Sequence, residues 1–220
     1  MTALFSEIIF GPIKSRRLGL SLGVNLLPLD SKLCSFDCIY CECGWAEGGH
    51  MPRFNPRERV RELLGEKLRE MTSAGTPPDV ITFAGNGEPT MHPDFEAIID
   101  DTIELRNRFA PTAKISVLSN ATQLHREGVV RALHRIDNPI LKLDSAIEAT
   151  AQAINKPCGA YTVAGVVEQM KRVGGDFVLQ TMFLRGEYAG CRVDNTSEEE
   201  VAAWLHLVEQ IAPRQVMVYS

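Results

Sequence analysis

Six short apolar runs, rich in β-branched residues, recur along the 220 residues of the chain. Each predicts a buried strand, because a strand covered on both faces carries apolar side chains in succession. The runs span residues 23–29, 79–85, 113–119, 139–144, 176–184 and 215–220. Segments with the helical period separate them, at residues 55–71, 92–109, 124–136, 159–173 and 197–211.

The alternation of strand and helix predicts an α/β fold of parallel strands joined by right-handed crossovers. Two architectures satisfy it, an open partial (β/α)6 barrel with outer helices and a doubly wound sheet. Both place functional side chains at the C-terminal ends of the strands. Ser197, followed by Glu198, Glu199 and Glu200, also predicts a capped start for the last helix.

Composition places the chain among globular proteins, with 45% hydrophobic and 23% charged residues. We expect a single domain over residues 1–220. Because no apolar run approaches the ~20 residues of a membrane span and no secretory leader opens the chain, we expect a cytoplasmic protein without a membrane partner. The net charge of -5 disfavours a large nucleic-acid surface.

Three cysteines, Cys34, Cys38 and Cys41, lie in a predicted loop of about residues 30–55, and Cys43 follows two positions later. A loop of this length in a compact domain is usually functional. A structural zinc site needs four ligands, for which Cys43 and His50 are the nearby candidates, although a Cys-x-Cys spacing separates two side chains unless the backbone turns sharply. A redox pair leaves Cys34 unexplained. Three thiolates on a cubic iron–sulfur cluster leave the fourth iron open to another ligand.

The Cys34-x-x-x-Cys38-x-x-Cys41 spacing, with Tyr40 before the last cysteine and Gly-Glu-Pro-Thr at residues 87–90, resembles the radical S-adenosylmethionine superfamily. Residues 11–30 and 84–95 are similar to the subgroup related to wyosine-type tRNA base synthases. The resemblance implies a partial barrel that holds a [4Fe–4S] cluster on the three cysteines. It further implies that the reduced cluster cleaves S-adenosylmethionine, and that a 5′-deoxyadenosyl radical abstracts hydrogen from a substrate.

The resemblance also implies cofactor contacts at the strand ends. We expect them from Tyr40 beside the adenine and from the following residues: Gly85, Asn86, Gly87, Glu88, Ser119, Asn120, Lys142, Asp144, Ser145 and Gln180. Lys142 and Asp144 share one face of a strand, so an internal ion pair is the alternative interpretation. For the substrate, the candidates are Arg16 and Arg17 as an anion site, together with His50 and Tyr219.

The leading hypothesis is an enzyme acting on a small molecule such as a modified base, nucleoside or nucleotide, with a flavodoxin or ferredoxin as one-electron donor. The acidic charge makes tRNA a less favoured partner than a small ligand. Two alternatives are an activase that installs a glycyl radical on a partner protein and a zinc-stabilised binding module without catalysis. Cys43, Cys158 and Cys191 have no assigned role, and we expect no second cluster.

Overall fold

The structure is a computed structural model that describes residues 3–15, 17–46 and 53–220. Within these residues, seven strands form one sheet in the order β1-β2-β3-β4-β5-β6-β9. Six strands run parallel: β2 (Gly19–Val24), β3 (Val80–Phe83), β4 (Lys114–Ser119), β5 (Asn138–Lys142), β6 (Val178–Met182) and β9 (Gln215–Tyr219). The edge strand β1 (Ile9–Ser15) pairs antiparallel with β2.

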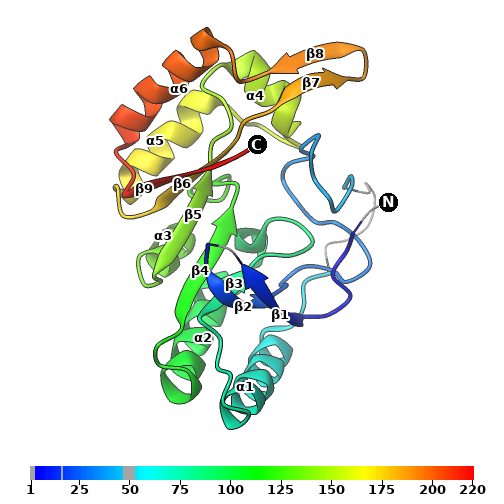
Figure 1. Ribbon diagram of the computed structural model, residues 1–220, viewed down its shortest axis with the longest axis vertical. Helices are drawn as coiled ribbons and strands as arrows, with labels where there is room; N and C mark the ends of the chain where they lie inside the picture. The colour runs from blue at the N-terminus through cyan, green and yellow to red at the C-terminus, as the bar shows by residue number, and fades with distance from the viewer. Residues whose placement is uncertain (1–2, 16, 47–52) are drawn as a thin grey trace.

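The parallel strands follow one another in sequence order, so the sheet has no point at which the winding reverses. With right-handed crossovers, such an order places the connecting helices on one face. Figure 1 shows the helices along that outer side: α1 (Arg57–Ser73), α2 (Phe95–Phe109), α3 (Glu127–Leu133), α4 (Glu148–Asn155), α5 (Val163–Val173) and α6 (Glu198–Ile211). The predicted α/β fold is confirmed, in its partial-barrel form. None of the helices in the described ranges is long and apolar enough to cross a membrane.

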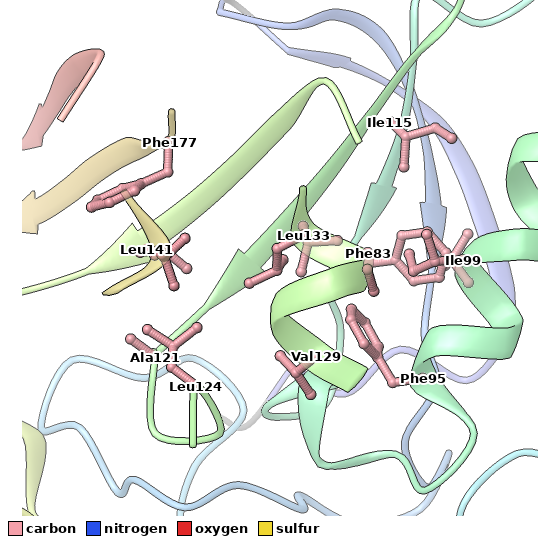
Figure 2. Close-up of a cluster of buried hydrophobic side chains, with 14 of the residues drawn as sticks. Phe83, Phe95, Ile99, Ile115, Ala121, Leu124, Val129, Leu133, Leu141 and Phe177 are labelled. Atoms are coloured by element: carbon pink, nitrogen blue, oxygen red, sulfur yellow. The ribbon is translucent and has the colours of Figure 1, made fainter. Parts of the chain in front are cut away.

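Side chains on each parallel strand alternate between the helices and the barrel interior. Figure 2 shows Phe83 of β3, Leu141 of β5 and Phe177 in the core that the strands share with the helices. The Phe83 ring meets the Phe95 ring of α2 edge to face, with 6.4 Å between the ring centroids. The opposite faces of the strands point into the barrel and are available for the site.

Two helix starts are capped by the side chain that precedes them. The Ser197 hydroxyl accepts a hydrogen bond from the Glu200 amide at 3.3 Å, which confirms the predicted start of α6. The Thr162 hydroxyl accepts one from the Gly165 amide at 3.1 Å at the start of α5. Each cap satisfies an amide that the first turn of a helix leaves unpaired.

Some predicted boundaries were wrong. The first parallel strand covers residues 19–24 rather than 23–29, because Leu26 and Leu27 are buried from a loop and so mimic a strand in the hydrophobic pattern. The antiparallel strand β1 was not predicted. Neither were α4 and the exposed hairpin of β7 (Arg185–Tyr188) and β8 (Cys191–Asp194), which are short and mostly polar.

The Phe83 side chain is fully buried in the core, so its truncation should strongly reduce stability. We expect Phe83→Ala to lower the free energy of unfolding by about 3–5 kcal/mol, through lost burial and the cavity left behind. Urea denaturation followed by circular dichroism measures it. Leu205→Ala, at a side chain 49% exposed on α6, is the control and should change stability by about 0.5 kcal/mol or less. Equal effects would contradict the assigned core.

Candidate active site

The cysteine loop, residues 25–46, docks directly on the residues that follow β3. The Leu33 amide donates to the Asn86 carbonyl at 2.8 Å, and the Glu88 amide donates to the Leu33 carbonyl at 3.1 Å. Gly87 lies between these bonds with φ of 141°, and a β-carbon there would stand 1.8 Å from the Leu33 oxygen. Only glycine permits this approach of two backbones.

The other side of the loop is held by the segment after α4 (Figure 1). The amides of Asp37 and Ile39 donate to the carbonyls of Lys156 and Ile154 at 3.1 and 2.9 Å. In the reverse direction, the Cys158 amide donates to the Ser35 carbonyl at 2.9 Å. The loop is therefore clamped between the end of β3 and the end of α4, which fixes its backbone on both sides.

A buried lysine ties the loop to itself. The Lys32 side chain is 1% exposed and pairs with Asp37 at 2.9 Å. The same ammonium donates to the Gly44 carbonyl at 2.9 Å, and Asp37 also accepts from the Ala46 amide at 2.8 Å. These bonds join the beginning, middle and end of the loop around the three cysteines.

A cavity of about 280 Å³ opens at the C-terminal ends of the strands. Nine of the predicted site residues line it: Cys38, Tyr40, Cys41, Gly85, Gly87, Lys142, Asp144, Gln180 and Tyr219. Gln180 and Tyr219 thus both face the cavity. Cys34 lies just outside this lining, where its sulfur accepts from the Phe36 amide at 3.4 Å. A larger cavity of about 700 Å³ at the other end of the barrel is lined by Arg17, Asp79 and Lys114 among others, and by none of the cysteines.

Lys142 and Asp144 form the ion pair that the sequence offered as the alternative interpretation, with 3.2 Å between Nζ and Oδ2. The Lys142 ammonium also donates to the Cys38 sulfur at 2.8 Å. Burial alone would lower the pKa of Lys142, but the Asp144 carboxylate and the Cys38 thiol raise that pKa well above its ordinary value. Lys142 is therefore a fixed positive charge beside one of the three thiols.

Asp144 is buried and accepts several hydrogen bonds. Its donors are the Tyr40 hydroxyl at 2.6 Å, the Asn155 amide group at 2.7 Å and the Met182 backbone amide at 3.0 Å. Through Tyr40 this carboxylate holds the cysteine loop, and through Met182 it holds the end of β6. Asp144 thus joins the loop to two strand ends of the barrel.

The three thiols differ in their electrostatic surroundings. Burial, together with the charge of Glu88, raises the pKa of Cys34 to about 12. Burial also raises the pKa of Cys38, although Lys142 opposes the shift. A hydrogen bond from the Cys43 thiol lowers the pKa of Cys41 to about 5, against its burial and with help from Lys32. Cys41 is therefore the thiol that ionises first.

Several predicted cofactor residues have their side chains bound within the protein. The Asn86 amide bonds the backbone of Phe5 and Pro28, and the Glu88 carboxylate accepts from Thr90 and the Asn120 amide. The Asn120 side chain donates to the Ser35 hydroxyl and accepts from the Thr122 hydroxyl. The Ser119 hydroxyl accepts from the Ala121 amide, and the Ser145 hydroxyl donates to the Glu200 carboxylate. Within residues 85–88, only Gly85 and Gly87 line the cavity, and they do so with their backbone.

Arg17 lies in the β1–β2 turn and crosses to the opposite edge of the sheet. Its guanidinium donates to the Val218 carbonyl at 3.0 Å and stacks on the Tyr219 ring at 4.0 Å from the centroid. A third cavity, of about 210 Å³, lies beside this contact and shares Leu118 and Tyr219 with the cysteine cavity. The other two substrate candidates, Arg16 and His50, lie outside the described residues.

Sequence reasoning missed Lys32 and Asn155, both buried beside the thiols. Asn155 bonds Asp144, and its amide nitrogen lies 3.9 Å from the Cys38 sulfur. A lysine two positions before Cys34 was the available signal, but a charged residue in a polar loop is usually solvated. Asn155 had no signal, since only the packing of α4 brings it to the site.

The donor set fits an iron–sulfur cluster. Cys34, Cys38 and Cys41 lie in one clamped loop, and a four-iron cluster takes each thiolate on a different iron. The cationic Lys142 beside Cys38 and Lys32 beside Cys41 also suit a set of negatively charged sulfurs.

Comparison with known proteins places the chain in a family. The model of the radical SAM superfamily matches residues 30–194, which is more than half of the chain. The chain belongs to this superfamily, a class of enzymes that use a [4Fe–4S] cluster and S-adenosylmethionine. It is 30% identical over 182 residues to a UPF0026 protein of Helicobacter pylori (strain ATCC 700392 / 26695), covering 81% of this chain and 57% of that protein. The chain thus spans just over half the length of this relative.

Two solved structures share the fold. A radical SAM methyltransferase from Sphaerobacter thermophilus superposes with a TM-score of 0.64 at 12% identity, over 90% of this chain and 54% of the other. Archaeal TYW1 superposes with a TM-score of 0.58 at 12% identity, over 91% of this chain and 64% of the other. At such identities the likeness concerns the fold alone, and it agrees with the partial barrel.

The thiol environments predict a distinct pH dependence of alkylation in the metal-free protein. A thiolate forms as the pH rises through the pKa, so Cys41 should react with iodoacetamide down to about pH 5. Cys34 should still be mostly protonated and slow at pH 9. Cys43→Ala should move the Cys41 profile to higher pH, because it removes the hydrogen bond that most lowers the pKa. Mass spectrometry of the alkylated peptides measures each profile.

N-Acetylcysteine in the same tubes controls for the pH dependence of the reagent. Overlapping pH profiles for Cys34 and Cys41 would contradict the assigned environments.

Proposed function

We propose that Cys34, Cys38 and Cys41 hold a [4Fe–4S] cluster with which the protein cleaves S-adenosylmethionine and abstracts hydrogen from a small molecule. The observation that carries the proposal is the placement of these thiols, in one clamped loop at the C-terminal ends of a parallel barrel, beside a cavity. When bound, the cluster and S-adenosylmethionine supply a 5′-deoxyadenosyl radical. The protein supplies position, charge and exclusion of water.

The residues around the cavity have separate roles in this proposal. Lys142 holds the Cys38 sulfur and balances its charge, while Asp144 fixes both Lys142 and Tyr40. The backbone of Gly85 and Gly87 faces the cavity without side chains, so a ligand can approach it closely. Tyr40 and Gln180 line the same cavity and supply polar contacts to the nucleoside part of the cofactor.

The shape of the interior supports a small substrate. The third cavity, of about 210 Å³, shares Leu118 and Tyr219 with the cysteine cavity. Tyr219, on which the Arg17 guanidinium stacks, lines both cavities. A modified base, nucleoside or nucleotide is the substrate class we propose, and it rests on the sequence resemblance to wyosine-type tRNA base synthases. A flavodoxin or ferredoxin is the proposed electron donor.

The test is formation of 5′-deoxyadenosine by anaerobically reconstituted protein given S-adenosylmethionine and dithionite. We expect the wild type to bind about four irons per chain and to form the nucleoside. Cys41→Ala should bind less iron and form none, because one of three ligands is lost. Liquid chromatography with mass spectrometry measures the product.

Cys191→Ala is the matched control, since Cys191 is exposed on the β7–β8 hairpin away from the cavity, and it should behave like the wild type. Zinc in place of iron would overturn the proposal, as would equal product from wild type and Cys41→Ala.

A further inference from the structure

Cys43 lies closer to Cys41 than the Cys-x-Cys spacing predicts. In an extended chain, residues two apart share one face but stand about 6.5 Å apart along the chain, so the thiols of Cys41 and Cys43 would not touch. Here the chain turns: the Gly44 amide donates to the Cys41 carbonyl at 3.2 Å, and Gly44 has a φ of 78°. The turn keeps the Cys43 thiol near Cys41, whose pKa it lowers.

The Cys43 sulfur also reaches the end of β3. It lies 3.5 Å from the Gly85 carbonyl oxygen. Both of its neighbours, Cys41 and Gly85, line the cysteine cavity. The thiol therefore stands at the rim of the cavity, between the last of the three cluster cysteines and the backbone that faces the proposed cofactor site.

The turn that carries Cys43 is fixed by buried contacts. The Lys32 ammonium donates to the carbonyl of Gly44, the residue after Cys43, and its own side chain is 1% exposed. Asp37 holds that ammonium from the other side at 2.9 Å. Because the anchors are protein groups, the position of Cys43 does not depend on a bound cofactor.

We propose that Cys43 is an exchangeable fourth ligand of the cluster, which occupies the iron left free by the other three cysteines until S-adenosylmethionine displaces it. The inference rests on the proposed function. In the exchange, the Cys43 thiolate would give up its bond to iron and take the proton that the ammonium group of S-adenosylmethionine must lose to bind. The amino and carboxylate groups of S-adenosylmethionine take its place, and no electron moves.

When no S-adenosylmethionine is present, the bond from Cys43 to the fourth iron would protect the cluster. An iron without a protein ligand is the one an oxidant removes most easily, and this loss converts a [4Fe–4S] cluster into a [3Fe–4S] cluster. Molecules in which Cys43 binds the fourth iron are closed to S-adenosylmethionine, and only the open fraction, in which that iron is free, can bind the cofactor. Removal of the Cys43 sulfur should therefore make the cluster more labile and the cofactor bind more tightly.

The experiment compares reconstituted wild type, Cys43→Ala and Cys43→Ser. Without S-adenosylmethionine, ferricyanide should produce the [3Fe–4S] signal in electron paramagnetic resonance several-fold faster in both variants than in wild type. With saturating S-adenosylmethionine, the three rates should converge. The variants should also bind the cofactor about tenfold more tightly if nine tenths of wild-type molecules are closed.

Cys191→Ala is again the control and should match wild type in both measurements, and the unfolding midpoint of each variant checks that the turn survives. Equal oxidation rates and equal cofactor affinities in wild type and Cys43→Ala would overturn the proposal. A Cys41–Cys43 disulfide in the reconstituted wild type would also overturn it, since Cys43 would then have no free thiolate.

The two proposals fail differently. An iron-loaded wild type that forms 5′-deoxyadenosine but is unaffected by Cys43→Ala keeps the proposed function and rejects the fourth ligand. A wild type that binds no iron rejects both.

Discussion

The close approach of two backbones, at Leu33 in the cysteine loop and Gly87 after β3, is the constraint on which the site depends. A parallel bridge joins these residues, and a β-carbon at position 87 would collide with the Leu33 carbonyl. This contact places the cysteines at the C-terminal ends of the strands instead of leaving them on a free loop. The glycine expected to admit a ligand thus also admits the protein's own chain.

Buried charges organise the rest of the cavity. Lys142, Asp144, Lys32 and Glu88 are all shielded from solvent, and each has a partner of opposite charge or several hydrogen-bond donors. An unpaired buried charge would be costly, so such groups persist where they are mutually satisfied. Their arrangement leaves the Glu88 carboxylate near Cys34, where it adds to burial in raising the pKa of that thiol, whereas the Cys43 hydrogen bond and then Lys32 lower the pKa of Cys41.

Prediction from sequence succeeded where the determining pattern is local. The βα alternation gave the α/β fold of parallel strands, and the spacing of Cys34, Cys38 and Cys41 indicated the superfamily that the family model confirms. The period-two rule placed Lys142 and Asp144 on one face, where they form the ion pair that was the alternative interpretation. It failed at the first parallel strand, since Leu26 is buried without belonging to it. The objection to Cys43 failed too, because the turn at Gly44 was not recognised.

The sequence by itself determined the class of fold and, through the spacing of Cys34, Cys38 and Cys41, the superfamily, because hydrophobic period and close spacing are properties of neighbouring residues. The tertiary structure decided which side chains face the cavity and which form their hydrogen bonds with other groups of the protein. The Asn86 side chain bonds Phe5 in the N-terminal segment, and the Asn155 side chain of α4 bonds Asp144. The Arg17 side chain bonds Val218 of β9. Such partners lie far apart in the chain, and no local pattern encodes which donor a buried acceptor will meet until the strands and helices have packed.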